Sequence, residues 1–73
     1  MDVKKDNFKR ISENRVSKIL MMLEQLTNLG NTSFYEYTDE EIEKIFDAID
    51  KQSKKSKEYL IKKINKNQKR FEL

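Results

Sequence analysis

Residues 28–42 read NLGNTSFYEYTDEEI, and this stretch decides the fold because it holds the clearest helix stop and start signals in the 73-residue chain. Gly30 is the only glycine, and the chain has no proline. A glycine directly after an apolar periodic segment is typical of the left-handed residue that ends a helix. Thr38 and Glu41 have the spacing of a capping box, in which each side chain bonds the other residue's backbone amide. The sequence therefore predicts a helix on each side of a nine-residue loop from Gly30 to Thr38.

The first helix is predicted over residues 6–29, with Asp6 as its N-cap. Its apolar residues recur at spacings of three and four, which is the period of an amphipathic helix. They are Phe8, Ile11, Ile19, Met22, Leu23, Leu26 and Leu29. Residues 1–5 are expected to form a frayed end.

The second helix is predicted over residues 39–70, and residues 71–73 are expected to fray. Its apolar residues fall within about 100° of arc if the helix is continuous. They are Ile42, Ile45, Phe46, Ile49, Leu60, Ile64 and Phe71. Ser53 and Ser56 interrupt this stripe within the weaker stretch 51–57. A bend there would produce a third helix, which is the main structural alternative.

The two apolar stripes match if the helices form an antiparallel hairpin. With Leu29 opposite Ile42, an equal rise along both helices places Ile11 opposite Leu60. The same register brings together the polar residues that interrupt the two stripes, and they would form one polar layer. These residues are Ser12, Arg15, Ser53 and Ser56. We therefore predict an all-α fold in a single domain, residues 1–73.

A hairpin alone leaves apolar surface uncovered. Leu20 and Met21 point away from the stripe of the first helix, so this helix is apolar around its circumference between residues 19 and 23. A domain of this size buries only about 60% of the surface of its unfolded chain. Dimerisation into a four-helix bundle is the economical solution, and a monomer with a bent third helix is the competing one.

The composition argues against several classes of function. The chain has no cysteine and no histidine, so it lacks the usual zinc ligands and the side chain best suited to acid–base catalysis at neutral pH. We expect no metal, no cofactor and no enzyme activity. The N-terminal residues lack a secretory signal. The longest apolar run, residues 19–23, is far shorter than the ~20 residues that span a bilayer, so we expect a cytoplasmic protein without a membrane partner.

Charge is distributed as basic, acidic and basic segments. Residues 1–23 carry a net charge of +3, residues 24–50 carry −7, and residues 51–73 carry +7. In the hairpin the two basic segments meet at one end, and such a patch would bind phosphate backbones. The candidate patch contains Lys4, Lys5, Lys9, Arg10, Lys55, Lys62, Lys66 and Lys69. The alternative interpretation is that these lysines form only the solvated face of the helices.

The loop holds three aromatic residues in four positions, Phe34, Tyr35 and Tyr37. Either Phe34 or Tyr35 would close the end of the bundle, and the other would be exposed to a partner. Together with Leu20 and Met21, Phe34 and Tyr35 form a candidate surface for a partner or a second copy. A purely structural role for the aromatic residues is the alternative.

Four short patterns carry a resemblance to a group of proteins. These are Phe8-x-x-Ile11-x-x-x-Arg15, Leu26-x-Asn28-Leu29-Gly30-Asn31, Tyr35-x-Tyr37 and Glu41-Ile42-x-Lys44-Ile45-Phe46-x-Ala48-Ile49. In this order they resemble small uncharacterised helical proteins carried on plasmids and phages of Gram-positive bacteria. The likeness covers roughly residues 8–60. It implies an association with mobile elements and implies no mechanism.

Two functions follow from these features as hypotheses. The first is an accessory or regulatory binding protein of a mobile element, whose basic end contacts nucleic acid or a nucleic-acid-bound complex. The alternative is a protein-only adaptor or inhibitor that docks through its acidic end, the aromatic loop and the apolar residues Leu20 and Met21.

Overall fold

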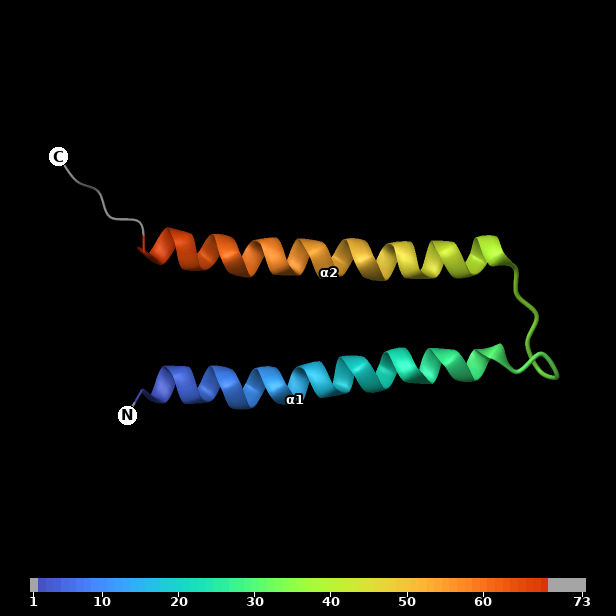
Figure 1. The fold of residues 1–73 in the computed structure, drawn as a ribbon, viewed down its shortest axis with the longest axis horizontal. Coiled ribbons are helices and arrows are strands. Elements are labelled where there is room, and N and C mark those ends of the chain that lie inside the picture. The colour runs from blue at the N-terminus through green and yellow to red at the C-terminus, as the bar shows by residue number, and fades with distance from the viewer. Residues whose placement is uncertain (1, 69–73) are drawn as a thin grey trace. The chain divides into compact units, whose positions relative to one another are not determined.

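The computed structural model describes residues 2–68, with side chains through Asn65. The elements are α1 (Val3–Leu26), the short 3₁₀ helix η1 (Thr27–Gly30) and α2 (Asp39–Gln68), shown in Figure 1. All regular structure in the described residues is helical, which confirms the all-α prediction. The chain divides between Glu36 and Tyr37 into two units, and each is described by itself.

α1 begins earlier than predicted because Asp2, not Asp6, is its N-cap. The Asp2 side chain accepts hydrogen bonds from the backbone amides of Lys4 at 3.1 Å and Lys5 at 3.3 Å. Asp6 lies in the first turn instead, where its amide donates to the Asp2 carbonyl at 3.0 Å. Nothing in residues 3–5 breaks a helix, so the earlier cap adds a turn and leaves Asp6 near the positive end of the dipole. Residues 3–5, predicted to fray, are therefore helical.

α1 ends without the left-handed glycine that the sequence predicted. No described residue, Gly30 included, has a positive φ angle. The backbone tightens into η1 after Leu26, and the Thr27 hydroxyl donates to the Glu24 carbonyl. A 3₁₀ turn and a threonine hydroxyl both satisfy carbonyl groups at a helix end. A left-handed residue is not needed there.

Asn31 organises the connector that follows η1. Its side-chain oxygen accepts from the Ser33 amide at 3.0 Å. Its backbone carbonyl accepts from the amides of Phe34 at 3.1 Å and Tyr35 at 3.0 Å. An asparagine that bonds the backbone two residues later is a common turn device. The turn is therefore set by Asn31, directly after the glycine that the sequence had singled out.

The start of α2 is the predicted capping box. The Thr38 amide donates to Glu41 Oε1 at 3.0 Å, and the Glu41 amide donates to Thr38 Oγ1 at 3.2 Å. The Thr38 hydroxyl also donates to Glu41 Oε1 at 3.1 Å. α2 begins at Asp39, as predicted. Two free amides of the first turn are thus satisfied by side chains.

Thr38→Ala is expected to destabilise the folded chain by about 1 kcal/mol, because it removes the acceptor for the Glu41 amide and one partner of the Glu41 carboxylate. Urea unfolding followed by circular dichroism measures this change. Thr32→Ala in the connector is the matched control, and we expect it to be near neutral. Equal effects of the two substitutions would show that the capping box does not stabilise α2.

α2 continues through residues 51–57, where the sequence left room for a bend. The Gln52 side chain donates to the Ser56 hydroxyl at 3.1 Å within this stretch. The third helix of the alternative prediction is not seen in the described residues. The predicted C-terminus of this helix at residue 70 and the frayed residues 71–73 lie outside them.

Neither unit contains a core of its own. None of the described side chains is buried, and only Ser12, Leu23, Leu26 and Ile49 are half-buried. The accessible surface is 7900 Å². Large apolar side chains are exposed in both units, for example Phe8 and Met22 in the first and Leu60 and Ile64 in the second. Exposed apolar side chains that lie together on one helix face are typical of an interaction site.

Candidate interaction surfaces

The apolar face of α2 is the most regular surface in the chain. Six positions define the α2 stripe, and their spacings are four, four, three, four and four. They are Ile45, Ile49, Ser53, Ser56, Leu60 and Ile64. Ile49 is half-buried, and the other five are exposed. One continuous helix holds all six positions on one side, since this spacing follows the helical repeat.

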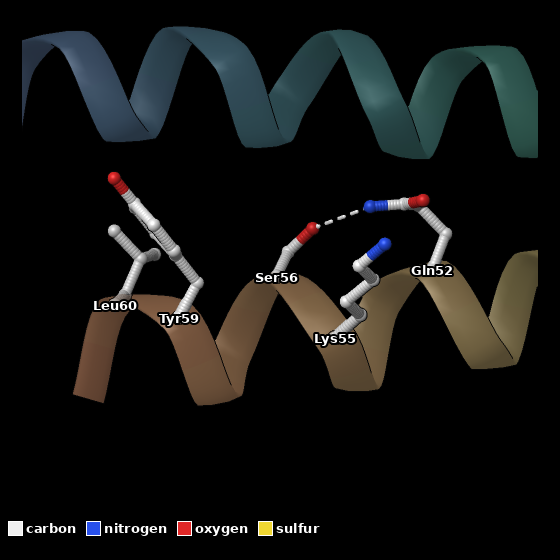
Figure 2. A pocket seen from close by; sticks show the side chains of 5 residues that line it. All are labelled: Gln52, Lys55, Ser56, Tyr59 and Leu60. Atoms are coloured by element: carbon white, nitrogen blue, oxygen red, sulfur yellow. Dashed lines mark hydrogen bonds between the residues drawn. The ribbon is translucent and has the colours of Figure 1, made fainter. Parts of the chain in front are cut away.

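Ser53 and Ser56 interrupt the apolar residues of the α2 stripe, and we call them the serine gap. Ser56 accepts a hydrogen bond from Gln52 on the same helix. Figure 2 shows Gln52 and Ser56 joined by the 3.1 Å bond, with Lys55, Tyr59 and Leu60 projecting from the same side of α2. These five side chains line a shallow, open hollow on the helix. The hollow combines an apolar residue and an aromatic ring with three polar groups. This is the composition of a contact surface and not of a closed ligand site.

An aromatic ring and a lysine pair beside this hollow. Lys63 Nζ lies 5.6 Å from the centre of the Tyr59 ring, within the range of a cation–π interaction. Gln52, Tyr59 and Lys63 were not among the functional residues predicted from the sequence. The sequence did offer a signal for both contacts. Gln52 and Ser56, like Tyr59 and Lys63, are four residues apart and are therefore neighbours on a helix.

A row of lysines follows one side of α2 away from the centre of the stripe, and its member Lys55 also lines the hollow with Ser56 and Leu60. Lys51, Lys55 and Lys62 are exposed and lie within about 40° of arc on the continuous helix. Lys66 belongs to α2, but its side chain is outside the described part of the chain, and Lys69 lies outside it entirely. We call Lys51, Lys55 and Lys62 the lysine row.

The basic residues of α1 lie in its first half. Lys4, Lys5, Lys9 and Arg10 are all exposed. Arg10 Nη2 donates to Asn7 Oδ1 at 3.3 Å, so this guanidinium has a neutral partner on its own helix. α1 and the lysine row belong to different units, and their joining into one patch stays a prediction.

The predicted polar layer is likewise divided between the units. Ser12 is half-buried, and its hydroxyl donates to the Lys9 carbonyl at 3.1 Å. Arg15 is exposed on α1, while Ser53 and Ser56 are exposed on α2. The hydroxyls of Ser12 and Ser56 therefore have partners within their own helices. The meeting of Arg15 with the two serines stays a prediction.

The side chains of the candidate partner surface in the first unit are exposed to solvent. Leu20 is 60% exposed and Met21 55% exposed on α1. In the connector Phe34 is 79% exposed and Tyr35 49% exposed. Phe34 is thus the more accessible of the two aromatic residues between which the sequence could not choose.

No helix in the described residues combines the length and the apolar character needed to cross a membrane. The same residues contain no group of three or more acidic, histidine or cysteine side chains that could hold a metal ion.

Comparisons of the chain with protein-family models, with curated proteins and with solved structures find no match. The resemblance to helical proteins of plasmids and phages therefore stays a prediction. The functional interpretation rests on the residues and the geometry described above.

Proposed function

We propose that the chain is a non-enzymatic binding protein whose basic residues contact nucleic acid or a nucleic-acid-bound complex. The observation that carries this proposal is the division of α2 into two faces. Lys51 and Lys62 lie on the side of α2 away from the α2 stripe, and Lys55 borders the stripe at the hollow that it shares with Ser56 and Leu60. One helix thus offers an apolar surface for assembly and, next to it, lysines for a polyanion. Lysines on an exposed helix face bind phosphates by charge, without reading base sequence.

The assembled form is proposed as an antiparallel hairpin of α1 and α2 that dimerises into a four-helix bundle. Two features support it: the agreement between the two apolar stripes and the lack of any buried side chain among the described residues. In the hairpin, Lys4, Lys5, Lys9 and Arg10 lie at the same end as the basic half of α2. This arrangement enlarges the positive surface that a nucleic acid would meet.

The cellular setting is proposed from the resemblance noted in the sequence. An accessory or regulatory protein of a mobile element, acting in the cytoplasm, would meet nucleic acid and the complexes that replicate or transfer it. A small protein with one basic face could attach to such a complex without any catalytic group of its own.

Lys55→Glu/Lys62→Glu is expected to weaken binding to DNA or RNA by about tenfold or more at low salt. Each lost phosphate contact should also reduce the slope of log K against log salt by about 1. Fluorescence anisotropy of a labelled duplex and a labelled single strand, over a salt series, measures both quantities.

Lys44→Glu is the matched control for this test because Lys44 lies on the same face of α2 but in its acidic half. We expect that change to alter binding by less than about threefold. If the double variant bound as tightly as the parent chain, or if the parent chain bound neither DNA nor RNA, the nucleic-acid proposal would be wrong.

The second candidate is a protein-only adaptor or inhibitor, and the exposure of Phe34 favours it. An aromatic ring that is 79% exposed in a short connector is a common anchor for a protein partner. The adaptor would dock through this connector, the acidic first half of α2 and the apolar pair Leu20 and Met21.

Tyr35→Ala with Met21→Lys is expected to abolish capture of a protein partner from host extract while leaving nucleic-acid binding unchanged. The reason is that the change removes one aromatic side chain and places a charge in the apolar surface. Phe34→Ala should reproduce most of the loss. Recovery of the same partner by parent and variant would eliminate the adaptor.

A further inference from the structure

We propose that α2 pairs with α2 of a second copy of this chain, antiparallel, about a two-fold axis that passes between Lys54 and Lys55. This inference names the interface, direction and register of the dimer, which the proposed function leaves open. It holds whether or not the lysine row binds nucleic acid.

Six positions of the apolar face of α2 have the symmetry that such a pairing requires, whereas Ile42 and Phe46 on the same face have no apolar counterpart in it. The spacings of the six positions, four, four, three, four and four, read the same from either end. An antiparallel copy therefore places Ile49 opposite the partner's Leu60, and Ile45 opposite the partner's Ile64. A two-fold interface must be self-complementary in this way. Ser53 then meets the partner's Ser56, so polar positions face polar positions and apolar ones face apolar ones.

A parallel pair would align the stripe equally well, and charge decides between the two directions. Residues 39–50 carry six acidic side chains and one lysine, whereas residues 51–68 carry seven lysines and one glutamate. A parallel pair sets acid against acid and lysine against lysine along the whole helix. An antiparallel pair sets each acidic half against a basic half, and complementary charge of this kind selects the orientation of paired helices.

Two residues of opposite charge lie at the edge of the stripe, and whether they meet across the dimer depends on its register. Asp50 and Lys57 flank the stripe on the same side, at about 90° and about 70° from its centre. In an antiparallel pair this side faces its own symmetry copy. The partner's Lys57 then lies two residues, about 3 Å, along the helix axis from the level of Asp50, within reach of its long side chain. The two-fold axis repeats the contact. The two residues are two turns apart on their own helix, so they do not pair within one chain.

The serine gap sits at the centre of the proposed interface. Ser53 and Ser56 lie on either side of the axis, where small side chains allow the two helices to approach closely. The hydrogen bond from Gln52 gives the Ser56 hydroxyl a partner, which lowers the cost of burying it in the interface. A slip by one heptad would set a serine against an apolar residue. Polar positions of this kind are known to fix register in paired helices.

The exposed apolar side chains of α2 supply the surface for this interface. A stable complex buries roughly 800 Å² on each partner. Ile45, Leu60 and Ile64 are 39%, 55% and 53% exposed, and none of the described side chains is buried. Lys51 and Lys62 stay on the outer side of the pair.

The test is a charge-exchange experiment read by sedimentation equilibrium on the full chain. Asp50→Lys and Lys57→Asp should each weaken the homodimer by about tenfold, because each sets like charges together twice. An equal mixture of the two variants should form a heterodimer about as tight as the parent dimer, since both contacts become opposite in charge. The double variant Asp50→Lys/Lys57→Asp should also recover parent affinity.

Two control variants carry the same kind of change on the outer face of α2. Glu58→Lys and Lys62→Asp should alter dimer affinity by less than about threefold. Circular dichroism on every variant reports whether α2 remains helical. If the mixture preferred no heterodimer, if the double variant stayed as weak as the single ones, or if the parent chain were monomeric, the proposed pairing would be overturned.

The direction of the pair has its own readout, because the chain contains no native cysteine. Spin labels on Lys44→Cys and Lys51→Cys occupy the same outer face. An antiparallel pair separates the two copies along the helix axis by about 32 Å at position 44 and about 10 Å at position 51. The label distance should therefore be clearly longer at 44. Equal distances would show a parallel pair and overturn the proposal.

Discussion

Ile49→Asp is expected to leave the chain monomeric at concentrations where the parent chain is a dimer, and to remove most of its helix. Ile49 is the half-buried member of the α2 stripe, and the proposed pairing would bury it fully. The change forfeits about 1.5–3 kcal/mol of apolar burial and adds the cost of an unpaired buried carboxylate. The two-fold axis repeats both effects in each dimer. Isolated helices in water are marginal, so loss of pairing should also mean loss of helix.

Ala48→Asp is the matched control for this prediction. It introduces the same charge one residue earlier, at an exposed position away from the stripe. Sedimentation equilibrium and far-UV circular dichroism on both variants compare mass and helix content directly. An Ile49→Asp chain as dimeric and as helical as the Ala48→Asp chain would show that the stripe is not an interface.

Ser53→Leu/Ser56→Leu is expected to give the second largest effect, in the opposite direction. Filling the gap makes the α2 stripe apolar along its whole length. Each buried leucine contributes roughly 1.5–3 kcal/mol, so the dissociation constant should fall by about 100-fold or more. The register should become less specific, because the polar positions that oppose a slip are gone. Urea unfolding at several protein concentrations measures the gain in stability.

The control for the added leucines is Lys51→Leu/Lys54→Leu, which has the same three-residue spacing on the outer side of α2. It should leave the free energy of unfolding nearly unchanged, since surface substitutions away from an interface have small effects. If this control stabilised the chain as much as Ser53→Leu/Ser56→Leu, general hydrophobicity and not pairing would explain the gain.

Local signals were sufficient to predict most of the secondary structure. The capping box of Thr38 and Glu41 located the start of α2 at the correct residue, because both partners lie within one turn. Asp6 was predicted as the first N-cap, and this was wrong because Asp2 can cap the helix equally well and the residues between them tolerate helix. The prediction at Gly30 was wrong because η1 and Thr27 satisfy the helix end by another route.

The interaction surfaces were predictable only in part. A surface on one helix follows from helical periodicity, whereas a surface shared by several helices depends on how they pack. Helical periodicity predicted the apolar face of α2 and the pair Leu20 and Met21, and Leu20 and Met21 are exposed on α1. Their role as a partner surface stays a prediction. The hydrogen bond of Gln52 and the cation–π contact of Tyr59 were missed, although the four-residue spacing could have indicated both. Assembly of the lysines into one patch depends on tertiary and quaternary packing. No pattern within a single helix determines that packing.

The central claim is that this chain obtains its core by pairing apolar helix faces with a second copy. Dilution of the parent chain, followed at once by sedimentation for mass and by circular dichroism for helix content, tests it most directly. We expect the mass to fall from twice 8.8 kDa to 8.8 kDa and the helix content to fall over the same concentration range. A monomer whose helix content does not change with concentration would contradict the claim.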